Sequence, residues 1–171
     1  MARSAMFARR QEAGSLDWKT TLFRGRYEHA IDKKGRTSLP AKFREVLGAS
    51  GDSRLILTSG LEPCVVAYPM QEWLAFEERL ASLPRFDPSV AMIRRIYVSG
   101  AVECEPDKMG RVLIPASLRK HARLERDALW AGMGHHAELW SSERFDALRA
   151  SVLEDDDKRQ AMAERLAELG L

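Results

Sequence analysis

The sequence predicts an α+β fold that consists mainly of short strands and is built from two copies of one unit. The first observation is an internal repeat: residues 32–44 (DKKGRTSLPAKFR) recur as residues 107–119 (DKMGRVLIPASLR), with seven identities at an offset of 75. The second is a tight-turn sequence, Asp-x-x-Gly, between two short strand-like segments in each copy. The third is a further pair of apolar runs after each copy. Each unit is therefore strand, turn, strand, helix, strand, turn, strand.

The turn residues justify the first strand pair of each unit. An aspartate carboxylate accepts hydrogen bonds from the backbone N–H groups that follow it, and a glycine supplies the positive φ that closes the turn. The structural turn residues are Asp32 and Gly35 in the first copy, and Asp107 and Gly110 in the second. The flanking strands are predicted at residues 26–31 and 36–39, and at residues 101–105 and 111–114.

A short helix follows each of these strand pairs. Pro40 and Pro115 suit the first position of a helix, where the missing N–H costs nothing, and Gly48 is predicted to cap the first helix. The side chains expected to face the core are Phe43, Val46 and Leu47 in the first copy, and Leu118 and Ala122 in the second. The second strand pair is predicted at residues 54–58 with 64–68, and at residues 128–131 with 137–140.

Helices are also predicted between and after the two units. The first connecting helix carries apolar side chains at helical spacing and ends at Pro84. Those side chains are Trp73, Phe76, Leu80 and Leu83. Asp87 and Pro88 start a second connecting helix, with Val90, Ile93 and Ile96 on one face. At the C-terminus, the stripes Phe145/Leu148/Val152 and Met162/Leu166/Leu169 flank an acidic run, and they could pack within the chain or against another copy.

Composition excludes several classes of protein. The chain has 171 residues, of which 45% are hydrophobic and 30% charged, and this is globular composition. It contains no apolar run long enough to span a membrane, and its first residues lack the apolar segment of a signal peptide. Cys64 and Cys104 form no CxxC pair, and the pair His135-His136 lacks a third metal ligand. We therefore expect a cytoplasmic protein without membrane association, metal or cofactor.

The repeated motif and its flanks resemble the MraZ family. The resemblance rests on residues 23–32 (FRGRYEHAID), the two Asp-x-x-Gly-Arg motifs, Tyr68-Pro69 with Trp73, residues 103–107 (ECEPD) and residues 138–140 (ELW). It extends from about residue 23 to residue 145, in the family's order and spacing. The chain departs from the family pattern at its N-terminus, where about 22 residues precede the first matching segment.

The resemblance implies the AbrB-type swapped-hairpin fold, in which two units interleave their hairpins, here as a pseudo-dimer within one chain. It also implies a nucleoid-associated transcription regulator that binds direct repeats in the double-stranded promoter DNA of its own bacterial division and cell-wall gene cluster. Such proteins assemble with themselves into ring-shaped homo-oligomers. The expected domains are a disordered extension at residues 1–21, AbrB-type domains at 22–70 and 99–142, a helical connector at 71–98 and C-terminal helices at 143–171.

The two copies differ in charge. Residues 24–44 carry a net charge of +5, whereas the equivalent residues 99–119 carry none. Because phosphate binding by cations releases counterions, DNA is expected to contact the first copy. The predicted DNA-binding residues are Lys33, Lys34, Arg36, Arg24, Arg26, Lys42 and Arg44, with Arg111 as a weaker candidate. Lys33 and Lys34 are expected on phosphates, and Arg36 nearest the bases.

Other interpretations of the same residues stay open. Arg36 and Arg111 could each form only a surface salt bridge to the turn aspartate, worth about 0–1 kcal/mol, although such a pair could also hold the arginine ready for DNA. An enzyme with a small-molecule substrate is disfavoured, because the sequence offers no Ser/His/Asp set, no paired catalytic carboxylates and no phosphate-binding glycine loop. The alternative function is a non-catalytic assembly protein or an antitoxin-like protein that binds a partner.

Overall fold

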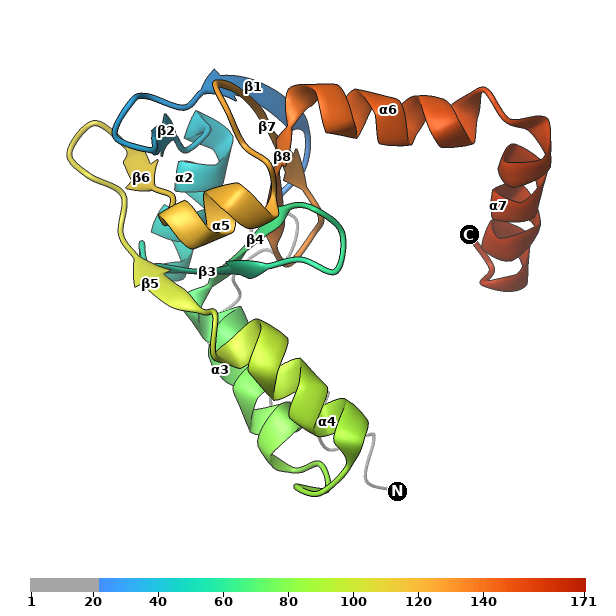
Figure 1. Cartoon of the computed structure of the whole chain (residues 1–171), viewed down its shortest axis with the longest axis horizontal. Coiled ribbons are helices and arrows are strands. Elements are labelled where there is room, and N and C mark those ends of the chain that lie inside the picture. Colours follow the sequence, from blue (N-terminus) through green and yellow to red (C-terminus); the bar gives the residue numbers. More distant parts are fainter. Residues whose placement is uncertain (1–21) are drawn as a thin grey trace.

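The computed structural model describes residues 22–171, so the expectation for residues 1–21 lies outside the described part of the chain. The fold is α+β, as predicted, with helices between and after the strand units (Figure 1). The strands are β1 (Arg26–Ala30), β2 (Arg36–Ser38), β3 (Leu55–Ser59), β4 (Val65–Pro69), β5 (Val102–Cys104), β6 (Arg111–Leu113), β7 (Asp127–Gly132) and β8 (Ala137–Ser141). The helices are α2 (Ala41–Ser50), α3 (Met70–Ala81), α4 (Pro88–Ile93) with a π-helical continuation (Arg94–Val98), α5 (Ala116–His121), α6 (Ser142–Leu153) and α7 (Asp156–Glu168).

The strands of the two repeats are exchanged. A six-stranded sheet has the order β1-β7-β8-β4-β3-β5, and β2 pairs with β6 in a separate two-stranded sheet. Thus β1 of the first repeat pairs with β7 of the second, and β5 of the second pairs with β3 of the first, all antiparallel. Within the first hairpin (residues 26–38), β1 and β2 meet only at the bridge between Ile31 and Thr37. The swapped-hairpin pseudo-dimer within one chain is therefore confirmed.

One hydrophobic core serves both repeats. Phe43 on α2 lies at its centre and contacts three aromatic rings edge to face, with ring centroids 5.0 Å away for Phe23, 5.3 Å for Tyr27 and 6.3 Å for Trp130. Such edge-to-face pairs add about 0.5–1.5 kcal/mol each to the burial of the rings. The indole N–H of Trp130 donates to the carbonyl of Ser38 at 3.1 Å, which ties β7 to β2. Neither repeat can fold around this core alone, because its aromatic residues come from both.

The helix ends differ in detail from the sequence prediction. Pro40 and Pro115 lie one residue before α2 and α5, in extended conformation, rather than at the first helical position. Gly48 does not cap α2: the helix continues to Ser50, and Gly51 with φ +76° is the C-cap. The prediction was wrong because a glycine near a helix end favours termination only when the next residues cannot extend the helix, and Ala49 and Ser50 can.

The connecting helices form a hairpin that projects from the body of the molecule (Figure 1). Trp73 and Leu80 are buried as predicted, whereas Leu83 lies beyond the end of α3 and is exposed. Asp87 caps α4 as predicted, with its carboxylate accepting from the N–H groups of Ser89 at 2.7 Å and Val90 at 3.2 Å. No helix within residues 22–171 is long and apolar enough to cross a membrane.

The C-terminal stripes lie on two helices, as predicted, and these leave the body as an arm (Figure 1). Neither α6 nor α7 buries a residue within the chain. The partly or largely exposed apolar side chains on them are Leu148, Leu153, Met162 and Leu166, with Leu169 just beyond α7. Packing within the chain accounts for Phe145 of the first stripe, whose ring centroid lies 5.8 Å from that of Trp140, but it leaves Leu148, Leu153, Met162 and Leu166 each 40–46% exposed.

The buried hydroxyl of Thr37 generates a stability prediction. Thr37 and its cross-strand partner Val112 are both buried, and the Thr37 hydroxyl has no hydrogen-bond partner within residues 22–171. Thr37→Val is expected to raise the free energy of unfolding by about 1 kcal/mol, because it removes a polar group that was desolvated without compensation. Urea denaturation followed by circular dichroism measures this change.

Thr58 provides the matched control. It is equally buried, but its hydroxyl donates to the carbonyl of Tyr97 at 2.7 Å. Thr58→Val is therefore expected to lower the free energy of unfolding by about 1 kcal/mol. Equal effects of the two substitutions would contradict the difference in hydrogen bonding between the two sites.

Candidate nucleic-acid interface

The turn of the first hairpin is closed by a clamp between Asp32 and Arg36. One carboxylate oxygen, Oδ1, accepts from the backbone N–H of Lys34 at 2.9 Å and of Arg36 at 3.0 Å. The other, Oδ2, lies 2.8 Å from Nε and 2.7 Å from Nη2 of Arg36. Gly35 closes the turn with φ +82°. The backbone and guanidinium N–H groups of Arg36 lower the pKa of Asp32 to about 2, so the carboxylate is charged at neutral pH.

The second hairpin (residues 102–113) repeats this clamp. Asp107 accepts from the backbone N–H groups of Met109 and Arg111, both at 2.9 Å, and pairs with the guanidinium of Arg111 at 2.8 Å. Hydrogen bonds from the Arg111 side chain and backbone hold the pKa of Asp107 below its ordinary value. Both arginines thus form the salt bridge that the sequence allowed. About a third of each side chain stays exposed, 30% for Arg36 and 34% for Arg111, so the clamp orients the guanidinium without covering it.

Each turn lies against an arginine of the other repeat. A Cβ at Gly35 would lie 2.8 Å from the guanidinium carbon of Arg119, and a Cβ at Gly110 would lie 2.9 Å from Cδ of Arg44. Arg44 was predicted to act with the first hairpin, but the exchange of hairpins places it beside the second. Arg119 takes its place beside the first turn, and sequence reasoning did not select it. The signal that could have found it is the identity of Arg44 and Arg119 within the repeat, combined with a swapped fold.

The remaining predicted cations lie in two places. Lys33 and Lys34 are exposed at the tip of the first turn, and no ion pair joins either to a carboxylate within residues 22–171. Arg26 lies at the far end of β1, about 20 Å along the chain from Asp32 at ~3.3 Å per residue. Arg24 and Lys42 line one hollow over Phe43, and Lys42 pairs with Glu45 at 3.0 Å. The structure therefore brings Lys33, Lys34, Arg36 and Arg119 together, but not Arg24, Arg26 or Lys42.

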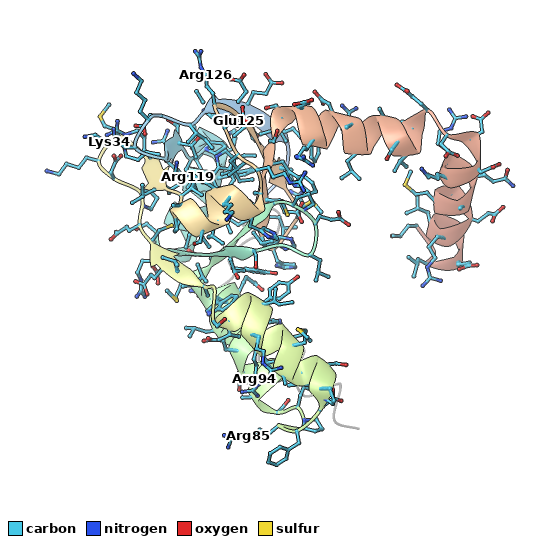
Figure 2. All side chains as sticks on the ribbon, in the orientation of Figure 1. Lys34, Arg85, Arg94, Arg119, Glu125 and Arg126 are labelled. Atoms are coloured by element: carbon cyan, nitrogen blue, oxygen red, sulfur yellow. The ribbon has the colours of Figure 1, made fainter. Side chains whose placement is uncertain are left out.

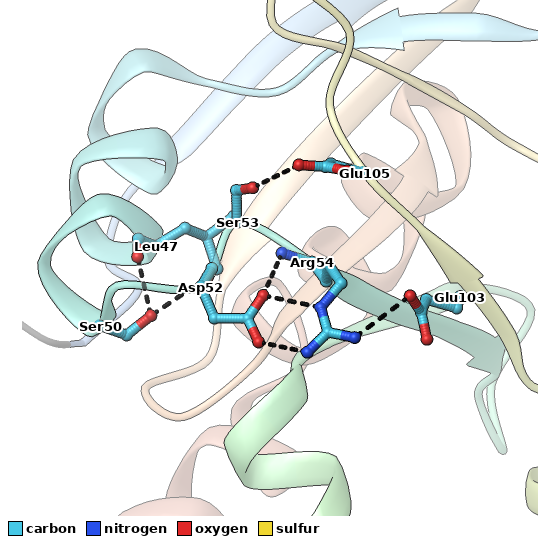
Figure 3. A network of polar contacts seen from close by, with 7 residues as sticks. All are labelled: Leu47, Ser50, Asp52, Ser53, Arg54, Glu103 and Glu105. Carbon is cyan, nitrogen blue, oxygen red and sulfur yellow. Dashed lines mark hydrogen bonds and ion pairs between the residues drawn. The ribbon is translucent and has the colours of Figure 1, made fainter.

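The base of the second hairpin is acidic and closed by ion pairs (Figure 3). Arg54 pairs with Asp52 at 2.8 Å and with Glu103 at 3.5 Å, and Ser53 donates its hydroxyl to Glu105 at 2.9 Å. These contacts join the loop between α2 and β3 to β5. They also neutralise the cation of that loop, so the loop itself offers little positive charge to a polyanion.

Cysteine and histidine side chains lie outside this surface. Burial raises the pKa of both Cys64 and Cys104 to about 12, which keeps them as unreactive thiols. His135 contacts Glu72 at 3.4 Å and His136 contacts Glu138 at 3.8 Å. Within the described residues, no group of three or more potential metal-ligating side chains comes together.

The exchanged hairpins and their clamped turns define the class: a tandem swapped-hairpin protein whose two hairpins differ in charge. The family model for the MraZ protein, described as antitoxin-like, matches residues 22–96 and 97–167, and the chain belongs to the MraZ family. Three similar relatives, all named transcriptional regulator MraZ, come from Pelotomaculum thermopropionicum, Desulfitobacterium hafniense and Heliobacterium modesticaldum. The first is 41% identical over 88% of this chain and 99% of its own. The second is 43% identical over 88% and 100%, and the third 46% over 72% and 84%.

The contact between Gly35 and Arg119 generates a prediction. Gly35→Ala is expected to destabilise the protein, because it places a Cβ at positive φ and against the Arg119 guanidinium. Gly134→Ala is the matched control, since Gly134 has φ +84° but no atom within 4 Å of the added Cβ. We expect Gly134→Ala to cost about 1–2 kcal/mol and Gly35→Ala to cost more.

A double variant separates the two causes. In an Arg119→Ala background, the cost of Gly35→Ala should fall to that of Gly134→Ala, because only the backbone penalty then remains. Thermal denaturation of the five proteins measures this. An unchanged cost in the Arg119→Ala background would show that Arg119 does not occupy the space beside Gly35.

Proposed function

We propose that this protein is a sequence-specific regulator that binds double-stranded DNA at direct repeats in the promoter of its own division and cell-wall gene cluster. Membership of a family whose relatives are named transcriptional regulators supports a role in transcription. The observation that carries the proposal is the first turn, where Lys33 and Lys34 project beside a clamped Arg36. The proposal places the protein in the cytoplasm, associated with the nucleoid, and assigns it no catalytic role.

The clamp suits base recognition. Arg36 is held by the carboxylate of Asp32, so its guanidinium is oriented before DNA arrives and loses less conformational entropy on binding. A fork of N–H donors on an arginine matches the O6 and N7 acceptors of guanine in the major groove. Lys33 and Lys34 are exposed point charges on the same turn, which suits phosphates on either side of the groove. The predicted division of roles follows from these two kinds of cation.

Three substitutions test the proposed DNA face. Arg36→Ala is expected to cost roughly 1–3 kcal/mol of binding and to reduce discrimination between boxes. Lys34→Ala should weaken binding to all sequences alike and lower the salt slope by about 1. Arg111→Ala, which removes the equivalent clamp in the second turn, should leave binding nearly intact. Gel shifts on the protein's own upstream region at two salt concentrations measure all three.

Circular dichroism of the same variants controls for folding. If Arg111→Ala lost binding while Arg36→Ala kept it, the DNA face would lie on the second hairpin, and its assignment to the first would be wrong. If the wild-type protein failed to shift its upstream region at low salt, the alternative of a non-catalytic assembly or antitoxin-like protein would replace the proposal.

We further propose that the protein acts as a ring-shaped homo-oligomer. Two kinds of surface support this. The arm of α6 and α7 leaves Leu148, Leu153, Met162 and Leu166 each 40–46% exposed, and β1 and β5 are the edge strands of the six-stranded sheet. One hairpin reaches only a few base pairs, and a ring that engages several boxes at once gains about 10²–10⁴ in apparent affinity.

Light scattering tests the assembly. The purified protein is expected to have a mass far above the 19.3 kDa of one chain at micromolar concentration. A truncation that ends at residue 153, and so removes α7, should lower the mass if the arm holds neighbouring copies together. A mass of one chain for the full-length protein would contradict the proposed assembly.

A further inference from the structure

The turn between α5 and β7 (residues 122–126) lies beside the first hairpin, although it belongs to the second repeat. Ala30 pairs with Asp127 at the end of the β1–β7 ladder, and the next residue, Ile31, donates its N–H to the carbonyl of Arg126 at 2.7 Å. The turn is thus fixed to the chain one residue before the Asp32 clamp. Figure 2 shows Arg126, Arg119 and Lys34 at the same end of the molecule, and Arg85 at the far end of the projecting helices.

This turn carries two exposed arginines, with Glu125 between them and Asp127 directly after them. Arg123 and Arg126 are exposed, and neither forms an ion pair with a carboxylate within residues 22–171. Arg123 has φ +50°, and within residues 22–171 it is the only residue other than glycine with a positive φ. This position after a helix usually holds glycine or asparagine, because other side chains are strained there. The chain has an arginine at a position where backbone conformation favours glycine.

The corresponding turn at the second hairpin is different. Leu55 pairs with Cys104 at the end of the β3–β5 ladder. Residues 52–54, directly before Leu55, are therefore equivalent to residues 125–127 at the end of the β1–β7 ladder. The position of Arg126 is occupied there by Ser53, whose hydroxyl donates to Glu105. The one cation of that turn, Arg54, is held by Asp52 and Glu103 (Figure 3). The turns beside the two hairpins therefore differ: two arginines without an ion pair lie beside the first hairpin, and one paired arginine lies beside the second.

We propose that Arg123 and Arg126 form a second phosphate-contacting element, so that the DNA interface is assembled from both repeats. This inference rests on the proposed function. The turn meets the first hairpin at Ile31, before the clamp, and not at the tip that carries Lys33 and Lys34. This position suits contact with the DNA backbone beside the groove rather than with the base edges inside it. Contacts of this kind position the duplex and carry no sequence information themselves.

Four variants test the inference. Arg126→Ala removes one charge, and Arg123→Gly removes the other while it relieves the positive φ, so loss of folding cannot explain its effect. Arg126→Lys keeps the charge and should retain most of the binding, since a phosphate needs only a point charge. Arg85→Ala is the matched control, because Arg85 is exposed on the projecting helices and its loss changes the net charge equally.

The readout is fluorescence anisotropy with two labelled duplexes of equal length, the protein's own upstream region and a random sequence, over a range of salt concentrations. Arg126→Ala and Arg123→Gly should each lower affinity roughly tenfold at about 0.1 M salt and reduce the salt slope by about 1, equally on both duplexes. Arg85→Ala should change neither quantity.

Each other outcome overturns the inference in a recognisable way. If both turn variants matched Arg85→Ala while Arg36→Ala still weakened binding, this inference would be wrong and the proposed function would stand. If Arg126→Ala weakened binding only to the upstream region, the residue would contact bases rather than phosphates. If the wild-type protein bound neither duplex, the proposed function would fail and this inference with it.

Discussion

The structure depends on one constraint: the first strand of each repeat finds its partner only in the other repeat. β1 pairs with β7, β5 pairs with β3, and the two return strands β2 and β6 pair with each other. An isolated hairpin of three to five residues a side is marginal in water, and here the strands of one hairpin meet at a single bridge. The exchange therefore supplies the backbone hydrogen bonds that the hairpins lack. It also forces both repeats to share the core around Phe43 and Trp130.

The same exchange explains how a chain with a net charge of only +2 can present a strongly basic surface. Each turn adjoins a helix and a loop from the opposite repeat, so the local charge is a sum over distant segments of sequence. At the first turn the sum includes Lys33, Lys34 and Arg119. At the second it includes Lys108 and Arg44, but also Glu103, Glu105 and an Arg54 that is already paired. Pseudo-symmetry in the backbone is thus combined with asymmetry in charge, which is what one-sided contact with a polyanion requires.

The repeat in the sequence predicted the elements well because their signals are local. Asp32 and Gly35 define the turn through hydrogen bonds and a positive φ that involve only neighbouring residues, and Asp87 caps α4 for the same reason. Three features were not predictable in this way. The end of α2 at Gly51 rather than Gly48 depends on whether Ala49 and Ser50 continue the helix. The placement of Arg44 beside Gly110 depends on strand exchange, which the charge comparison between repeats ignored.

The third feature, the contribution of the turn after α5, was hidden because residues 123 and 126 lie outside the repeated motif and about 90 residues from the hairpin they adjoin. Alignment of the repeats can identify equivalent residues, but it cannot show which copy each one contacts.

Comparison of the two turns separates the structural part of the motif from the part available for binding. The clamp of aspartate, glycine and arginine has nearly the same hydrogen-bond distances at Asp32 and at Asp107. The clamp therefore serves to close the turn, and it is present whether or not the surrounding residues are basic. The residues that differ stand between the clamp positions and on the strand behind them: Lys34 corresponds to Met109, and Ser38 to Leu113. Met109 and Leu113 are largely exposed apolar side chains, unsuited to phosphate.

It follows that the Asp-x-x-Gly-Arg motif alone does not identify a DNA-binding turn. In both copies the carboxylate lies against the arginine, and its negative charge offsets the charge that the guanidinium would offer to a phosphate. A turn with only this pair would therefore be close to neutral. The positive charge of the first turn comes from the cations around the clamp, some at its own tip and others from the repeat with which it exchanged strands.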